Sequence, residues 1–347
     1  MNDVHDDIRA AVDAMCAAAV EREPATADTF DPTLWKELAQ TGFTGLGIDE
    51  RVGGSGGELT DLAVVVETAA RHRARIPLAE TTFLAGWLLG AAGLSRPDDT
   101  PMTASEDLLV VDRGDGAVSG AVSAPWGRHA GHAAVLVERA GELLISVFPL
   151  GAPEGPTIVR GANLAGEPRD TLVFDGCPLP ERVIKAPAGV ERSAILARGA
   201  LARTVQLAGA ADSVLAMSVR HAGEREQFGR SLDRFQAVQH HLAALAAEVS
   251  AVRTAAAAAV LAVQADAPGA ALAVAAAKAT ASASAYTVAT IGHQIHGAIG
   301  YSREHALGSA TTRLLSWRDE FGSESHWQDE LADMVLGSDS WWHALTS

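Results

Sequence analysis

Several features that mark specialised classes of protein are scarce in this sequence of 347 residues. It contains two cysteines, Cys16 and Cys177, which lie far apart and belong to no Cys-x-x-Cys pair or His/Cys cluster. This spacing disfavours both a disulfide framework and a structural zinc site. Basic residues are also few, because 27 Lys+Arg stand against 43 Asp+Glu, for a formal net charge of −16. Such a charge repels nucleic-acid phosphates and anionic membrane surfaces, so neither is an expected partner.

An uninterrupted apolar run of membrane-spanning length is also missing. The Ala-rich stretches of the C-terminal half are broken within short distances by Arg253, Asp266, Pro268 and Lys278, so we expect buried helices of a bundle there. The chain opens with the acidic sequence MNDVHDD, where a secretory signal needs a basic region followed by an apolar run. These features predict a cytoplasmic protein that does not enter a membrane.

Motifs of nucleotide, hydrolase and metal chemistry are absent too. The glycine-rich segment at 53–57 follows no strand and precedes no Lys-Ser/Thr pair, which excludes a P-loop. The sequence has no G-x-S-x-G elbow. Two histidine pairs, His293 with His296 and His129 with His132, each lack a third ligand, so no metal is expected.

The periodicity of apolar residues divides the chain into three regions. Helical spacing holds from residue 3 to about 95, with a helix start at Asp31-Pro32-Thr33 and a glycine-rich loop at 42–57. From about 105 to 185 the pattern changes to short apolar runs separated by turn residues, at 108–111, 133–137, 143–148, 157–159 and 171–174. Helical patterns return as long stretches at 192–222, 234–265 and 270–296. The sequence therefore predicts an α+β fold that is mostly α.

Two motifs in the last third are specific enough to identify a family. The first is R-E-Q-F-G at 225–229, followed by F-Q-A-V-Q at 235–239 and L-A at 242–243. The second is Q-I-H-G-A-I-G-Y at 294–301, with Glu304 just after it. Together with W-K-E-L-A at 35–39, these segments resemble the R-x-x-F-G … F-Q-x-x-Q, Q-x-x-G-G-x-G-[YF] and W-x-x-L-A patterns of the acyl-CoA dehydrogenase family.

The resemblance implies an N-terminal helical domain at 1–100, a reduced central β domain at 101–187 and a C-terminal four-helix bundle at 188–347. It also implies FAD as cofactor, an acyl-CoA substrate, an electron-accepting flavoprotein as possible further partner, and assembly with a second copy or a homologous subunit. In the family, the residues that match Arg225, Phe228, Gln236, Gln294 and Gly297 reach across a subunit interface to the FAD of the neighbour.

The chemistry of these residues agrees with that role. The guanidinium of Arg225 suits a pyrophosphate, and Gln227 and Gln294 can donate to phosphate or ribose oxygens. Phe228 offers a flat apolar surface, and Gly297 allows close approach of the backbone. Taken one at a time, each side chain has a simpler interpretation as surface charge, core or solvated helix face. Together, the residues predict cofactor binding.

The sequence departs from the family pattern at two places. The central T-E-P-x-x-G-S-D segment, which wraps the flavin, is replaced by T-P-M-T-A-S-E-D-L at 100–108. The catalytic glutamate, which most members hold in a Y-E-G-T segment, is replaced by Phe321 in E-F-G-S at 320–323, and the alternative position used by some members falls near Gly199-Ala200. Glu320 is then the nearest candidate for the base that removes the α-proton. The alternative is a solvated acid beside Arg318 and Asp319.

Both departures resemble the reduced subunit of heteromeric family members, notably those of bacterial steroid side-chain degradation. On that interpretation, this chain completes a flavin site with a partner and takes part in α,β-dehydrogenation of a CoA thioester. Two alternatives remain open. One is a self-sufficient homomeric dehydrogenase with Glu320 as base, and the other is a flavin-free structural subunit.

Overall fold

The computed structural model describes residues 2–22, 30–111, 116–180, 182–302 and 305–337. Contacts between residues group the chain into two compact units, neither of which is continuous in sequence. The first comprises Met1–Ala25, Ala63–Ala74 and Ala200–Ser347, and the second comprises Thr26–Leu62 and Arg75–Gly199. The three domain ranges expected from the sequence stay a prediction. Glu304 lies outside the described residues.

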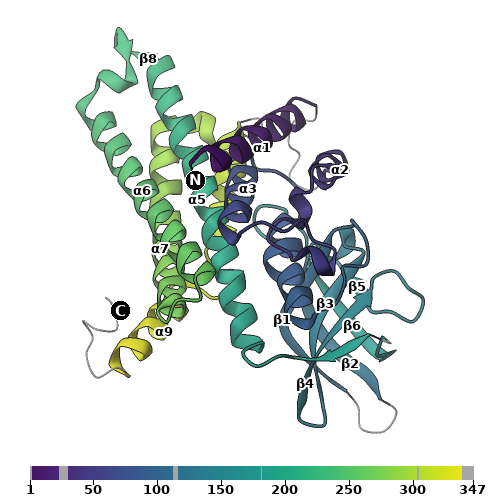
Figure 1. The fold of residues 1–347 in the computed structure, drawn as a ribbon. Helices are drawn as coiled ribbons and strands as arrows, with labels where there is room; N and C mark the ends of the chain where they lie inside the picture. Colours follow the sequence, from purple (N-terminus) through teal and green to yellow (C-terminus); the bar gives the residue numbers. More distant parts are fainter. Residues whose placement is uncertain (1, 23–29, 112–115, 181, 303–304, 338–347) are drawn as a thin grey trace. The chain divides into compact units, whose positions relative to one another are not determined.

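The first unit is helical apart from a two-stranded arm, and long antiparallel helices form most of it (Figure 1). The three long stretches expected from periodicity are confirmed as helices, although α5 starts in the second unit and continues in the first. The elements are α1 (Asn2–Arg22), α3 (Leu59–Arg71), α5 (Arg192–Glu224), β8 (Glu226–Gln227), β9 (Arg230–Ser231), α6 (Gln236–Gln264), α7 (Ala270–His296), α8 (Ala306–Trp317) and α9 (Glu324–Leu336).

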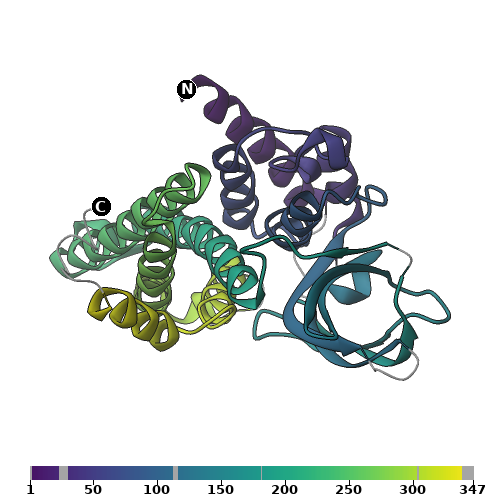
Figure 2. The same cartoon turned by 60° about the horizontal axis from the view of Figure 1, so that its bottom comes forward.

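Apolar side chains from α5, α6, α7 and α8 meet in the core of this unit. Figure 2 shows the ribbons of the bundle helices, coloured from teal to yellow, lying beside one another. Nearly half of the buried side chains are alanines, so helix backbones can approach closely. The closest crossing involves Gly209 on α5, where an added Cβ would lie 2.1 Å from the carbonyl oxygen of Glu67 on α3. The core residues with larger side chains are Leu207, Val214, Met217, Leu245, Val249, Val252, Val288, Ile295, Leu307, Leu314 and Trp317.

Replacing Gly209 by alanine is therefore expected to force α3 and α5 apart and to lower the free energy of unfolding by about 1–3 kcal/mol. Gly223 on the same helix is the matched control, because nothing lies within 4 Å of its added Cβ. Gly223→Ala should stabilise by up to about 1 kcal/mol, as helix propensity dictates. Urea unfolding of both variants checks this, and equal effects at the two positions would contradict the close crossing.

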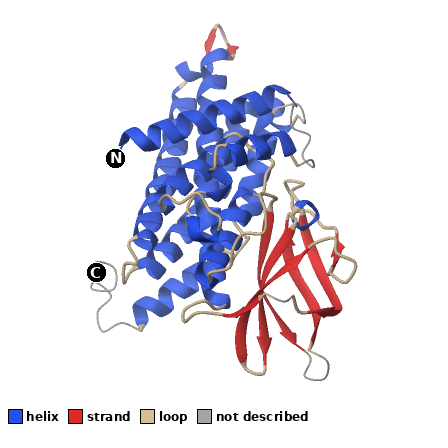
Figure 3. Ribbon diagram, turned by 45° about the vertical axis from the view of Figure 1, so that its right-hand side comes forward, coloured by secondary structure: helices blue, strands red, loops and turns tan. Residues whose placement is uncertain are grey.

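The second unit contains a seven-stranded sheet in the order β5-β6-β2-β1-β3-β4-β7 (Figure 3). Only β1 and β3 pair in parallel, and every other neighbouring pair is antiparallel. The strands are β1 (Met102–Val111), β2 (Ala117–Pro125), β3 (His132–Arg139), β4 (Glu142–Pro149), β5 (Thr157–Val159), β6 (Arg169–Pro178) and β7 (Val183–Lys185). All five expected apolar runs are confirmed as strands, and together the two units confirm the mostly α, α+β class.

The inner face of the sheet forms an apolar core of its own. Val118, Val135, Val137 and Leu172 are fully buried there, and the rings of Phe148 and Phe174 meet edge to face with centroids 4.8 Å apart. Alternation along β1 is interrupted by an irregularity between Ala104 and Leu108. The sheet thus has its own packed interior, as a separate compact unit requires.

The second unit also contains short helices outside the strands: α2 (Pro32–Gln40), the 3₁₀ turns η1 (Phe43–Gly45) and η2 (Glu50–Val52), the π-helix η3 (Glu80–Gly86), α4 (Trp87–Ala92) and, between β2 and β3, η4 (Gly127–His129). The expected cap at Asp31 is present, because its Oδ1 accepts from the amide of Leu34 at 2.9 Å. The glycine-rich loop passes closest to its own chain, since an added Cβ at Gly54 would lie 2.1 Å from the carbonyl oxygen of Ile48.

Among the described residues, one helix is long and apolar enough by length and composition to cross a membrane. It is α6, and only 28% of its most apolar window is buried inside the chain. Nearly half of its exposed residues are alanines, among them Ala243, Ala247, Ala251 and Ala258, and most of the others are polar. The helix packs on α7 with its other face, where Leu245, Val249 and Val252 are buried.

Candidate functional site

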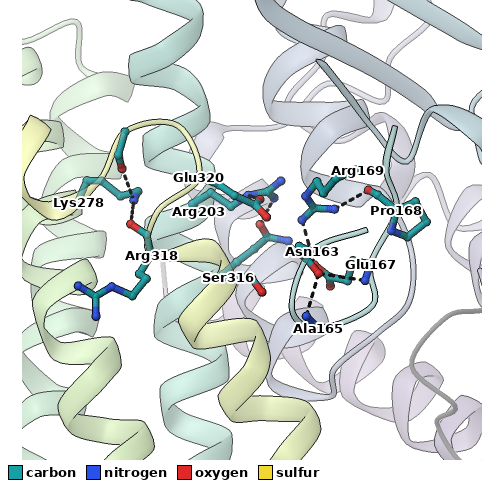
Figure 4. Close-up of polar contacts among 12 residues, drawn as sticks. Asn163, Ala165, Glu167, Pro168, Arg169, Arg203, Lys278, Ser316, Arg318 and Glu320 are labelled. Carbon is teal, nitrogen blue, oxygen red and sulfur yellow. Dashed lines mark hydrogen bonds and ion pairs between the residues drawn. The ribbon is translucent and has the colours of Figure 1, made fainter. Parts of the chain in front are cut away.

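The loop between α8 and α9 carries Glu320, the candidate base, and a buried lysine anchors this loop (Figure 4). Lys278 on α7 is fully buried, and its Nζ donates to the carbonyl oxygens of Arg318 at 2.7 Å and Gly322 at 2.9 Å. A third bond from Nζ goes to the hydroxyl of Ser282 at 3.0 Å. An ammonium has three protons, so Lys278 is fully satisfied by holding both ends of the loop.

The backbone of this loop is tightly constrained at its centre. Phe321 has φ of 53° and Gly322 has φ of 93°, so two successive residues lie in the left-handed region. At Gly322 an added Cβ would come within 2.5 Å of the Trp327 side chain. Trp327 also donates from Nε1 to the carbonyl oxygen of Phe321 at 2.9 Å. The conformation therefore depends on packing as well as on Lys278.

Glu320 is not a solvated acid, because its Oε2 accepts from Nε of Arg203 at 2.7 Å. Arg203 lies on α5 with 1% of its side chain exposed, against 19% for Glu320. Its guanidinium also faces the ring of Phe321, 5.3 Å from Cζ to the centroid, and donates to Gln206. The pair gives Glu320 a structural role, since a buried guanidinium needs a carboxylate nearby. Proton transfer by Glu320 stays a prediction.

Replacing Glu320 by alanine should lower the free energy of unfolding by about 3–5 kcal/mol, because the carboxylate that neutralises buried Arg203 is removed. The double variant Arg203→Met, Glu320→Met should recover most of that loss, since an apolar pair leaves no uncompensated charge. Urea unfolding of the single and double variants measures the difference. A single variant no less stable than the double one would contradict the structural role.

Burial lowers the pKa of Lys278 to about 7 from its ordinary value of 10.5. The positive charges of Arg203 and Arg318 act in the same direction, and Asp319 and Glu320 act against it. Between these two pH values the unfolded chain binds a proton that the folded chain has released. The contribution of Lys278 to stability is therefore complete above the unfolded pKa and is lost as the pH falls through the folded one.

Stability is accordingly expected to rise with pH above about 7, by up to about 1.4 kcal/mol per pH unit from this group. The variant Lys278→Met lacks this titration and serves as the reference. Urea unfolding of both proteins at neutral pH and about two pH units higher should show the difference moving in favour of the native lysine. A difference that stays constant or reverses its sign would rule out a depressed pKa.

The motif at 225–229 forms an arm that extends from the bundle, seen at the top of Figure 1. Arg225 follows the last residue of α5, and Gln227 pairs with Arg230 across the two short strands. All three side chains are exposed. The arm is braced by Arg230, whose Cζ lies 4.1 Å from the ring centroid of Phe235. Gln236 then begins α6, also exposed.

Phe228 at the tip of the arm combines two unfavourable features. Its side chain is 92% exposed, and its φ of 55° lies in the left-handed region, followed by Gly229 at 79°. Two successive positive φ values favour Asn-Gly at this kind of hairpin turn, and a bulky residue there costs about 1–2 kcal/mol. Within the chain the ring makes an edge contact with Phe235, with centroids 6.3 Å apart, and most of its surface stays exposed. Its surface is suited to a contact outside the chain.

The end of α7 lies near the arm. Ring centroids of His221 in the last turn of α5 and His296 in the last turn of α7 are 4.6 Å apart, and Arg225 bonds through its amide to the carbonyl oxygen of His221. Gln294 is exposed in the same turn of α7. Gly297 ends the helix with φ of 61°, and nothing lies within 4 Å of its added Cβ, so its backbone is open to close approach.

The predicted site residues therefore form two groups. Arg225, Gln227, Phe228 and Gln236 lie on or beside the arm, and Gln294 and Gly297 lie at the adjoining end of α7. Glu320 lies elsewhere, beside Lys278, which is sixteen positions before Gln294 and so about 24 Å away along the same helix.

The sequence did not point to Arg203 or Lys278 as site residues. The available signal was a single basic residue within an otherwise small and apolar helical stretch, at 201–208 and 270–279. In the described part of the chain, no group of three or more His, Cys, Asp or Glu side chains is arranged to hold a metal ion. Of the two histidines considered as a metal pair on α7, His293 stacks on Tyr301 with centroids 4.3 Å apart.

Two family models match this chain. Residues 190–325 match the family model "Acyl-CoA dehydrogenase, C-terminal domain", and residues 2–94 match "Acyl-CoA dehydrogenase, N-terminal domain". "Acyl-CoA dehydrogenase IpdE2" of Mycobacterium tuberculosis is 33% identical over 300 residues, which cover 84% of this chain and 82% of that protein.

Two solved structures share the fold. The ChsE4-ChsE5 complex from Mycobacterium tuberculosis matches with a TM-score of 0.86 and 20% identity, over 98% of this chain and 99% of that one. The "Tcur3481-Tcur3483 steroid ACAD G363A variant" matches with a TM-score of 0.83 and 24% identity, over 97% of this chain and 98% of that one.

Proposed function

This chain belongs to the acyl-CoA dehydrogenase family, and we propose that it is a flavoprotein subunit that completes a flavin site with a homologous partner and takes part in α,β-dehydrogenation of a CoA thioester. The observation that carries the proposal is the arm. Phe228 is exposed and strained in the isolated chain, and a contact with a ligand or subunit outside the chain gives that arrangement a purpose.

The residues of the arm and of the α7 end fit a dinucleotide. Arg225 would neutralise pyrophosphate charge, Phe228 would cover an aromatic edge, and the open backbone at Gly297 would allow close approach. Gln227, Gln236 and Gln294 offer exposed amides for ribose or phosphate oxygens. When bound, FAD accepts the hydride that leaves the β-carbon of the thioester.

The second unit supports the proposal that the flavin site is shared with a partner. The stretch that replaces the flavin-wrapping motif is part of β1, where Thr103 is fully buried and its hydroxyl donates to the carbonyl oxygen of Pro125 at 2.7 Å. Ser105 Oγ is likewise within hydrogen-bonding distance of the Asp107 carboxylate, at 3.3 Å. These hydroxyls serve the sheet, so the remainder of the flavin site is assigned to the partner.

Two further observations support a homologous partner. The outer face of α6 exposes several alanine side chains and Leu261, a surface suited to another helix. The base position holds Phe321, and the nearby Glu320 is bonded to Arg203. One similar solved structure is the ChsE4-ChsE5 complex, and another is the Tcur3481-Tcur3483 steroid ACAD variant, which is also named for two proteins. We assign the base to the partner and a flavin-holding role to this chain.

The test counts flavin per protomer by visible absorption in the purified chain, alone and co-expressed with a homologous subunit. Flavin should appear only in the complex. Phe228→Asn should leave the isolated chain as stable or more stable by about 1 kcal/mol, because Asn-Gly suits the turn, yet lower flavin occupancy of the complex. Leu164→Asn is the matched control, since Leu164 is 66% exposed in the second unit.

Each alternative gives a distinct result in the same measurement. Full flavin occupancy of the isolated chain would favour a self-sufficient homomeric dehydrogenase and make Glu320→Gln the next variant for activity. Absence of flavin from every assembly would favour a structural subunit. Equal loss of flavin in the Phe228 and Leu164 variants would remove the specific role of the arm.

A further inference from the structure

Arg198, in the second compact unit, lies against an aromatic frame. It stands in the second turn of α5, and its Nε donates to the carbonyl oxygen of Phe83 at 3.2 Å. Its Cζ lies 5.5 Å from the ring centroid of Phe83 and 5.8 Å from that of Trp87. Both distances are within the range of cation–π contact. The guanidinium is thus held in place by one hydrogen bond and two rings.

The frame is supplied by an unusual helix. Phe83 belongs to the π-helix η3 (Glu80–Gly86), and Trp87 begins α4 directly after it. A π-helical turn is wider than an α-helical one and is frequent at functional sites. Phe83 is fully buried, whereas Arg198 and Trp87 are partly exposed. The aromatic frame is therefore open on the side of Arg198 and Trp87.

No acidic side chain compensates the charge of Arg198. It forms no ion pair with any residue that the structure describes, and its Nη donors have no acceptor there. Burial lowers the pKa of Arg198 to about 10, which still leaves it charged at neutral pH. A charge removed from water without a partner is unfavourable for folding.

Two other enclosed arginines, Arg128 and Arg203, differ in this respect. Arg128 bonds the buried carboxylate of Asp170 through Nε at 3.0 Å, and Arg203 bonds Glu320 at 2.7 Å. With 43 acidic residues in the sequence, carboxylates are plentiful. The lack of one beside Arg198 leaves a planar set of donors available to a ligand.

We propose that Arg198 binds a carboxylate carried by the acyl group of the CoA thioester, so that the substrate is a dicarboxylic acid monothioester. This inference rests on the proposed function for the thioester itself. One positive charge in an apolar aromatic frame balances the single negative charge of a carboxylate, whose two oxygens match the guanidinium fork. A phosphate monoester carries more charge and calls for several donors.

The experiment uses the complex of this chain with its flavin-completing partner. Adipoyl-CoA and hexanoyl-CoA are the probes, because they have equal chain length and differ in a terminal carboxylate against a methyl group. Glutaryl-CoA and suberoyl-CoA, each against its monocarboxylic counterpart, extend the comparison to shorter and longer chains. Calorimetry measures the affinity of each, and size-exclusion chromatography reports that the complex is intact.

The native complex should bind the carboxylated probe of the best length about 10- to 100-fold more tightly than its neutral counterpart, as a charge-assisted bond provides. Arg198→Gln should abolish this preference while leaving affinity for the neutral probe nearly unchanged, and Arg198→Lys should keep part of it. Arg192→Gln is the matched control, since Arg192 begins the same helix, is exposed and donates to the Glu106 carbonyl.

Three results would overturn the inference. A native complex that shows no preference at any length has no carboxylate receptor. If Arg198→Gln weakens all CoA esters and free CoA alike, the residue binds a CoA phosphate instead. If it weakens both kinds of ester but not free CoA, Arg198 supports the packing of Phe83 and Trp87 only. In each case binding of hexanoyl-CoA leaves the proposed function standing, whereas failure of every CoA ester to bind defeats both.

Discussion

The enclosure of basic side chains among alanine-rich helices is the constraint on which the rest of this structure depends. Small side chains let the helices of the bundle approach closely, but they offer few large apolar groups with which to fix a loop. Lys278 supplies the fixation in polar form, because one buried ammonium holds the carbonyl oxygens at both ends of the loop after α8. Charge is thus used here to define a conformation.

A second buried basic residue, Arg203, fixes the same loop, in the segment where most members of the family hold the catalytic base. Its guanidinium binds Glu320 and faces the ring of Phe321, the residue that stands where a glutamate is expected. An aromatic ring can pack between a cation and a tight turn, and Phe321 occupies such a position beside Arg203. The substitution therefore keeps the packing of the loop while removing a proton acceptor from its centre. A subunit that relies on its partner for chemistry needs the first property and can lose the second.

The sequence predicts the long helices and most strands because their signals are local. The stretches at 192–222, 234–265 and 270–296 repeat apolar residues at helical spacing, and the strand at 143–148 is a continuous apolar run bounded by turns. The sequence does not indicate β2, because its residues, AVSGAVSAP, include no successive strong β-formers. The segment becomes a strand through its pairing with β6 and β1. The π-helix at 80–86 is likewise not indicated, because no spacing of apolar residues in this segment distinguishes it from an α-helix.

The site residues also fall into those that a local sequence pattern reveals and those that it does not. The motif at 225–229 could be found from sequence because its residues are contiguous, and the structure adds that Phe228 is strained as well as exposed. Arg203 and Lys278 could not, since their importance lies in being buried beside partners 117 and 40 to 44 positions away. No local pattern reports such a contact.

Two arginines of α5, five positions apart, show how the chain distributes its own carboxylates. Arg203 forms an ion pair with the carboxylate of Glu320, so its charge is compensated within the chain. Arg198 receives no carboxylate from the described residues, and its guanidinium is held by the carbonyl oxygen of Phe83 and the rings of Phe83 and Trp87. A charge without a partner is costly to stability, and under the proposal a carboxylate outside the chain completes the pair. By the same reasoning, the strained ring of Phe228 and the uncovered alanine face of α6 are incomplete until another molecule meets them. Under the proposed function, these are the features of the chain that are directed at ligand and partner.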